Sequence, residues 1–188
     1  MWAKVESNSV TKIYTRPKAL TIGDVNYPSN IMSIWSASEL GAIGIYEITV
    51  DSTNLKDERY YQNTDITYAY DSEAVTGTYG SATAKSLTNV LYTAQNESDG
   101  LGTEGEVRTL GLKITHKESI NSQANVLLQK YDWYTLRAAD GGTAVPSAVT
   151  TYKAAVRTKA NTHCTAIDAA ANVDALAALT FDWPSEPS

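Results

Sequence analysis

The stretch KYDWYTLRAADGGTAVP, residues 130–146, decides the fold of the C-terminal half. A helical pattern precedes it, and Gly141-Gly142 end that pattern. Pro146 with Ser147 then begins a second helix, at a position where the missing N–H of proline costs nothing. Two helices joined by a short turn form an antiparallel hairpin. We therefore predict an antiparallel helical hairpin over residues 107–171.

Apolar residues recur at helical spacing on both sides of this turn. The first stripe is narrow because Lys117 and Asn121 interrupt it. A narrow stripe suits packing against one partner helix more than burial in a thick core. We expect the hairpin core to contain Leu110, Ile114, Ala124, Leu128 and Tyr131 from the first helix and Val149, Tyr152, Val156 and Ile167 from the second.

An Asp-Trp pair occurs twice, as Asp132-Trp133 inside the hairpin and as Asp182-Trp183 in the C-terminal FDWPSEPS. One interpretation is structural: Asp132 caps the last turns before the break, and Trp133 buries its ring where the helices diverge. In the alternative, Trp133 and Trp183 form part of an interface with a partner. The sequence leaves both interpretations open.

The first 80 residues read as short strands joined by tight turns. Turn residues at Ser7-Asn8-Ser9, Gly23-Asp24 and Asp71-Ser72-Glu73 each separate two runs with strand character, which predicts three β-hairpins. Ser36 and Glu39 have the spacing of a capping box over a short helix. We predict an N-terminal antiparallel β unit with a short helix over residues 1–80.

Two segments complete the expected organisation. Residues 81–106 form a polar, Gly-rich connection with one short strand at Val90-Leu91-Tyr92. Residues 172–188 form an acidic C-terminal tail. The fold class that follows is α+β, with the strands and the helices in separate halves of the chain.

Charge is unevenly distributed along the chain. Residues 109–165 carry 7 basic and 3 acidic side chains, whereas residues 166–188 carry 4 acidic side chains and no basic one. We expect the tail to fold back on the hairpin or to meet the same segment of a neighbouring copy. The net charge of −6 argues against nucleic acid as the main partner, because such binding depends on neutralising phosphates.

Three motifs are candidates for sites of chemistry. Gly100, Gly102 and Gly105 in DGLGTEG satisfy G-x-G-x-x-G before a helical pattern, but a polar, acidic segment precedes them where a nucleotide site needs an apolar strand. A flexible linker is favoured there. His163-Cys164 point about 100° apart on a helix, which favours a surface histidine beside a core cysteine over a metal or nucleophile site.

The third motif is a pair of neighbouring carboxylates such as Asp57-Glu58. A turn-forming role explains such a pair better than the acid-base site of a small hydrolase. We therefore expect no catalytic residue, no metal site and no cofactor.

Aromatic residues with a polar tip are unusually common, with 12 tyrosines and 4 tryptophans against 1 phenylalanine. Such rings suit half-buried strands and contact surfaces. Tyr60 and Tyr61 are neighbours on a strand pattern, so one of them must be exposed or must meet a partner. An aromatic platform also keeps open a carbohydrate-binding module.

The C-terminal half resembles the helical region of bacteriophage tail assembly chaperones and tail fibre assembly proteins. The resemblance lies in LLQKYDWYTLRAADGGTAVPSAVTTYKAAVRTKAN, residues 127–161, and in a "WP…P" close formed by Trp183, Pro184 and Pro187. Its elements are Leu127-Leu128, Asp132-Trp133, Pro146, Tyr152-Lys153 and Val156-Arg157. The first 80 residues, including WSASELGAIGIYEI, resemble the front half of tail-associated proteins of marine phages.

The resemblance implies a non-catalytic protein that binds a tail fibre, an adhesin or another tail subunit, with oligomeric copies in the virion tail. Lys153 stands where the family usually has arginine, which leaves open whether the chain is a transient chaperone or a permanent virion component. The alternative is a carbohydrate-binding module that recognises a host-surface glycan at the tail tip. The residues expected to bind the partner are Asp132, Trp133, Arg137, Tyr152, Arg157, Trp183, Pro184, Tyr60 and Tyr61.

The N-terminal MWAKVESNSV lacks the charged-then-apolar layout of a signal peptide. No apolar run approaches the roughly 18 residues that a membrane span needs. We expect a soluble protein that is made in the host cytoplasm and has no membrane span.

Overall fold

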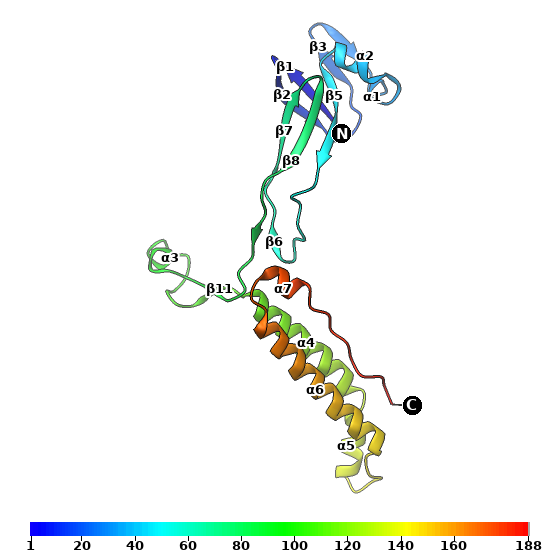
Figure 1. Ribbon diagram of the computed structural model, residues 1–188, viewed down its shortest axis with the longest axis vertical. Helices are drawn as coiled ribbons and strands as arrows, with labels where there is room; N and C mark the ends of the chain where they lie inside the picture. The colour runs from blue at the N-terminus through cyan, green and yellow to red at the C-terminus, as the bar shows by residue number, and fades with distance from the viewer. Residues whose placement is uncertain (188) are drawn as a thin grey trace. The chain divides into compact units, whose positions relative to one another are not determined.

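The computed structural model describes residues 1–187 and divides into two compact units, residues 1–83 and residue 84 onward (Figure 1). Strands dominate the first unit and helices the second. The predicted α+β class is therefore confirmed.

A five-stranded sheet forms the first unit. It contains β1 (Trp2–Glu6), β2 (Ser9–Tyr14), β5 (Ile45–Asp51), β7 (Ile66–Asp71) and β8 (Ala74–Tyr79), in the order β2-β1-β5-β8-β7. Three of the four pairings are antiparallel, as predicted, but β5 and β8 are parallel. This departs from an entirely antiparallel unit. The long excursion after β5 and the return along β7 bring β8 back in the direction of β5, as a parallel pair requires.

The predicted hairpin turns are all present. Ser7 and Asn8 join β1 to β2 with φ of 50° and 60°, and Ser72 and Glu73 join β7 to β8 with φ of 49° and 63°. Two successive positive φ values define the type I′ turn, whose twist matches that of the flanking strands. The third hairpin pairs β3 (Leu20–Ile22) with β4 (Val25–Tyr27) around a turn that contains Gly23.

The short helix of this unit begins where the sequence predicts. Helix α1 (Ile31–Ile34) precedes α2 (Ala37–Ala42), and Ser36 and Glu39 form the expected reciprocal capping box at the start of α2. Helices α1 and α2 pack against the sheet through one of the two apolar clusters of the unit. That cluster consists of Tyr14, Leu20, Ile31, Met32, Leu40 and Ile45, and the other consists of Ala3, Ile48 and Val75.

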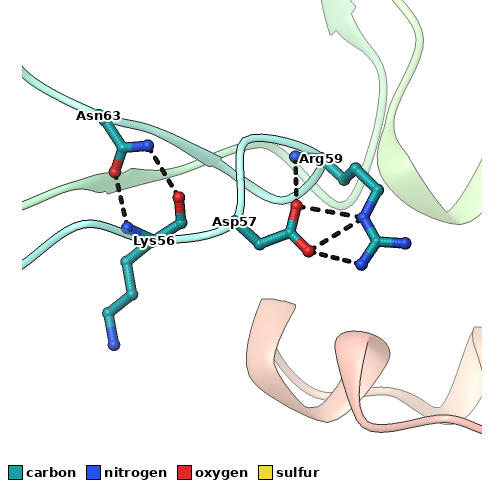
Figure 2. A network of polar contacts seen from close by, with 4 residues as sticks. All are labelled: Lys56, Asp57, Arg59 and Asn63. Atoms are coloured by element: carbon teal, nitrogen blue, oxygen red, sulfur yellow. Dashed lines mark hydrogen bonds and ion pairs between the residues drawn. The ribbon is translucent and has the colours of Figure 1, made fainter.

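The excursion between β5 and β7 is held by local polar contacts (Figure 2). The side chain of Asn63 accepts from the Lys56 backbone N–H at 2.9 Å and donates to the Lys56 carbonyl at 2.8 Å, as a neighbouring strand would. Asp57 accepts hydrogen bonds from the backbone and the guanidinium of Arg59. Strand β6 (Tyr61–Gln62), within this excursion, pairs with β9 (Thr83–Ala84). The excursion is therefore an ordered part of the unit.

The second unit begins with a short β-ribbon. Strand β10 (Val90–Leu91) pairs antiparallel with β11 (Val107–Thr109), and the turn of helix α3 (Ala94–Ser98) lies between them. The helix predicted from residue 107 therefore starts later, at Leu112. The prediction was wrong there because the segment around Val107 pairs with β10, and Leu110 is 47% exposed instead of joining the helical core.

An antiparallel helical hairpin makes up most of the second unit (Figure 1). Its long helices are α4 (Leu112–Gln129) and α6 (Ser147–Ala169), and α5 (Asp132–Ala139) and α7 (Val173–Ala177) follow them in turn. An ion pair between Lys117 and Asp168, at 2.8 Å, joins the start of α4 to the end of α6, so the two helices run in opposite directions. The predicted hairpin is thus present, with α5 as a separate helix at its turn.

The hairpin core uses one side of each long helix. All four residues predicted from α6 are buried, but only Ala124 of the predicted α4 stripe is. The buried side chains are Ile120 and Ala124 of α4, Val149, Tyr152, Lys153, Val156, Ala160, His163 and Ile167 of α6, and Val173 and Leu176 of α7. Within the described residues, no helix combines the length and the apolar character needed to cross a lipid bilayer.

Candidate binding surfaces on the helical hairpin

Helix α5 presents an exposed aromatic and cationic surface, which we call the tip patch: Trp133, Tyr134, Leu136 and Arg137. Trp133 is 49% exposed and Leu136 is 67% exposed. The Trp133 and Tyr134 rings stack with centroids 3.8 Å apart. Because Trp133 and Arg137 are one helical turn apart, the guanidinium lies over the indole at 4.9 Å and over the Tyr134 ring at 5.2 Å. The patch is therefore organised by its own contacts.

The electrostatics of α5 favour this arrangement. Asp132 lies in its first turn and Arg137 in its last turn, where each charge complements the helix dipole. The Arg137 Nε is buried and has no hydrogen-bond acceptor in the described part of the chain. Its guanidinium is therefore held mainly by the faces of the two rings, and its Nε–H donor is left without a hydrogen bond to the described residues.

An ion pair anchors α5 to α6. The Lys153 ammonium lies 2.7 Å from the Asp132 carboxylate and 3.4 Å from the Thr135 hydroxyl. Lys153 is only 8% exposed, so its charge depends on these partners. The sequence interpretation of Asp132 as a cap for the preceding helix is corrected here, because Asp132 is the first residue of α5 and pairs with α6. The buried-plug interpretation of Trp133 is also wrong, since its indole is half exposed.

Tyr152 and Arg157 lie on α6 in different environments. Tyr152 is 4% exposed, and its ring packs edge-on against Tyr131, 5.2 Å away. Burial raises the pKa of its hydroxyl, which has no hydrogen-bond partner among the described residues. Tyr152 therefore packs against Tyr131, the residue that precedes α5, and is not itself on the surface. Arg157 is exposed on α6.

The C-terminal tail lies along the hairpin (Figure 1). The imidazole of His163 is buried between the rings of Phe181 and Trp183, with centroids 5.1 Å and 5.3 Å away. Its Nε2 carries the proton, because it donates to the carbonyl of Asp182 at 2.8 Å. The Asp182 carboxylate receives both of its contacts from Lys159, at 2.7 Å and 2.9 Å. The tail thus packs two rings on either side of His163 and pairs one exposed carboxylate with Lys159.

Three further contacts extend this site. The Trp183 indole N–H donates to Gln123 on α4, and Glu186 pairs with Lys130 and accepts a hydrogen bond from Tyr131. We call the receiving side chains, Gln123, Lys130, Tyr131, Lys159 and His163, the tail groove. Pro184, Ser185 and Pro187 of the tail complete a hollow with Ser147, Ala148, Thr151, Tyr152 and Ala155 of α6.

The charges in the tail groove are complementary. The hydrogen bond from Lys159 holds the pKa of Asp182 below its usual value, and the hydrogen bond from Lys130 does the same for Glu186. The pKa of Lys130 is raised by the same contact. Of the two expectations for the tail, this structure shows the one in which it folds back on its own hairpin.

Tyr60 and Tyr61 lie in the first unit, and both are half-buried. The Arg59 guanidinium lies 5.5 Å from the centre of the Tyr60 ring. Neither tyrosine belongs to the tip patch or the tail groove. The expected partner-binding residues therefore fall into separate groups, and Asp132, Trp133 and Arg137 come together on α5.

Several sequence interpretations change in the structure. His163 is buried and Cys164 is partly exposed, the reverse of what we expected, because the tail covers His163. The residues after DGLGTEG form β11, not a helix, and Gly100 and Gly105 have positive φ values of 72° and 83° that suit turns. Among residues 1–187, no group of three or more His, Cys, Asp or Glu side chains is placed to hold a metal ion.

Some members of the two surfaces were not predicted. Tyr134 and Leu136 follow Trp133 in the sequence, and only a helix that restarts at Asp132 brings them to one exposed side. Gln123 and Lys130 meet the tail only in the folded hairpin. The opposite charges of residues 109–165 and 166–188 were the one sequence signal for that contact.

Comparison with known proteins gave no match to any family model, to any curated protein or to any solved structure.

Proposed function

We propose that this chain is a non-catalytic binding protein of a bacteriophage tail, which attaches to a tail fibre or another tail subunit through the tip patch. The phage assignment rests on the resemblance of residues 127–161 and of the C-terminal close to tail assembly proteins. The location proposed is the virion tail, after synthesis in the host cytoplasm.

The tip patch is the observation that supports binding most directly. Trp, Tyr and Arg are the residues that most often dominate the energy of protein interfaces, and here they are neighbours with one indole half exposed. The rings and the guanidinium are already ordered by stacking, so little side-chain entropy remains to be lost on binding. The ion pair between Lys153 and Asp132 fixes the helix that carries them.

The chemistry of the patch fits recognition better than catalysis. Its groups are two aromatic faces, an aliphatic side chain and a guanidinium. Such a set offers apolar contact and hydrogen-bond donors to a partner. It offers no nucleophile with an adjacent base.

A second candidate function is carbohydrate binding by the first unit. A hollow there is lined by Ala37, Ser38, Gly41, Ala42, Tyr46 and Glu73. A hydrogen bond joins the hydroxyls of Tyr46 and Tyr70, and this contact together with burial raises the pKa of Tyr46 to about 12. Hydroxyl, carboxylate and ring together are groups that bind sugars. A glycan array that stays blank at high protein concentration would remove this candidate.

Mass spectrometry of purified phage particles tests the principal proposal. Abundance near that of the fibre subunits would identify a permanent tail component. Presence in assembly intermediates but not in finished particles would identify a chaperone. Absence from both would contradict the assignment to the tail.

A further inference from the structure

We propose that the tail groove is a recognition site for the linear sequence Phe-Asp-Trp-Pro-Ser-Glu and that the tail of a second copy of this chain binds there in trans. This inference concerns a different surface from the tip patch. It does not depend on the proposed phage function.

Each side chain of the tail groove contacts a particular residue of the tail. His163 separates the rings of Phe181 and Trp183 and donates to the carbonyl between them. Lys159 takes the carboxylate of Asp182, and Gln123 accepts from the indole of Trp183. Lys130 and Tyr131 take Glu186. The groove therefore provides a contact for each of four tail side chains: the Phe181 ring, the Asp182 carboxylate, the Trp183 indole and the Glu186 carboxylate.

Side chains hold the described part of the tail beyond α7 to the hairpin. In its described part, beyond Leu179, no backbone group bonds to another backbone group, and the segment has no regular secondary structure. All the specific contacts arise from residues 181–186. The same six residues from another copy carry the same groups in the same order, so the groove cannot distinguish the two by chemistry.

Charge complementarity extends to the tail of another copy. Every tail is purely acidic in its charged residues, and every hairpin carries an excess of basic residues over acidic ones. A tail from one copy therefore complements the groove of any other. The short connection from α7 gives the chain's own tail an effective concentration on the order of millimolar. Exchange should consequently require dense packing of copies, as in an assembly, and should be rare in dilute solution.

A peptide-binding experiment on the full-length chain tests the recognition. In the variant D182A/W183A/E186A, the chain's own tail no longer competes for the groove. A fluorescent peptide of residues 179–188 should bind this variant at least tenfold more tightly than it binds the wild-type chain, as measured by fluorescence anisotropy. The same peptide carrying Asp182→Ala and Trp183→Ala is the matched control and should bind at least tenfold more weakly.

Any of three results would overturn the recognition claim. One is the absence of binding to the variant, checked as folded by circular dichroism. The second is equal binding of the peptide and its substituted control, and the third is equal binding of the peptide to the variant and to the wild-type chain.

A second experiment tests exchange between whole chains. In a Cys164→Ser background, chains with Lys130→Cys are mixed with chains with Glu186→Cys and oxidised at high protein concentration. A disulfide-linked dimer should form, and its yield should fall on dilution before oxidation. Replacing Glu186→Cys by Leu55→Cys, at an exposed position of the first unit, should abolish the dimer. Equal yields from the two mixtures, or no dimer at all, would contradict tail exchange and would leave the role of the tip patch unaffected.

Discussion

Trp183 donates its indole N–H to the side-chain oxygen of Gln123 at 3.1 Å, across 60 positions of sequence. On its other side the same indole packs edge-on against His163 of α6. One side chain of the tail therefore contacts both long helices of the hairpin. This makes Trp183 the residue whose removal should most directly free the tail.

Trp183→Ala should expose the C-terminal segment to proteases. Cleavage after residue 165 should become roughly tenfold faster, because proteolysis follows the open population and a loss of about 1.4 kcal/mol raises that population tenfold. Limited proteolysis with mass detection of the fragments measures this. Trp133→Ala, which removes an indole outside the tail groove, is the control and should leave the rate unchanged. An unchanged rate for Trp183→Ala would count against a docked tail.

Acid should release the tail. The pKa of Asp182 lies below its ordinary 3.8 and that of Glu186 below its ordinary 4.5, because each accepts a hydrogen bond from a lysine. Docking is therefore fully favoured above these ordinary values and weakens as the pH falls through the lowered ones. The indole N–H resonance of Trp183, followed by NMR, should shift in that range.

The variant D182N/E186Q removes both carboxylates and retains His163. Its indole resonance should show no transition in the same acid range. If the wild-type chain and the variant titrate alike, the two carboxylates do not hold the tail.

Asp132→Ala should destabilise the hairpin. It leaves the ammonium of Lys153 buried without its carboxylate, and a lost hydrogen bond to a charged group costs about 1.5–3 kcal/mol, with the lower end expected because Asp132 is itself exposed. Lys153→Met removes the charge and keeps the buried stem, so it should cost less. Urea unfolding of both variants measures the difference, and a larger loss for Lys153→Met would contradict this account of the pair.

Ser36→Ala should lower the free energy of unfolding of the first unit by about 1 kcal/mol, because it removes the cap of α2. Ser38→Ala, on the same helix and outside the capping box, is the matched control. Thermal denaturation followed by circular dichroism compares them, and equal midpoints would show that the capping box contributes nothing measurable.

Local signals predicted much of this fold. The turns at Ser7-Asn8, Gly23-Asp24 and Ser72-Glu73, and the capping box at Ser36, each depend on residues close in sequence, and each is present. The parallel pairing of β5 with β8 was missed because it depends on the path of more than 20 intervening residues. Strand β11 was missed because its partner, β10, lies beyond α3.

In the tip patch and the tail groove, too, local sequence predicted some features and missed others. The Asp-Trp pair at residue 132 marked the tip patch, but its exposure follows from the break between α4 and α5, which the sequence pattern did not show. His163 looked like a surface residue on its helix, and in the structure it is buried between two rings of the tail, which folds back over it. Contacts made by a distant segment that folds back on a helix are therefore the features of the site that sequence periodicity cannot predict.

Site-specific photocrosslinking from the tip patch tests the central claim most directly. A benzophenone amino acid placed at Trp133 should, during phage assembly, crosslink the chain to a tail fibre or tail subunit identified by mass spectrometry. The same group at Val25, an exposed position of the first unit, serves as the control. Crosslinks from residue 133 to a tail protein, absent from residue 25, are the predicted result. Identical products from both positions, or none from residue 133, would contradict binding through this surface.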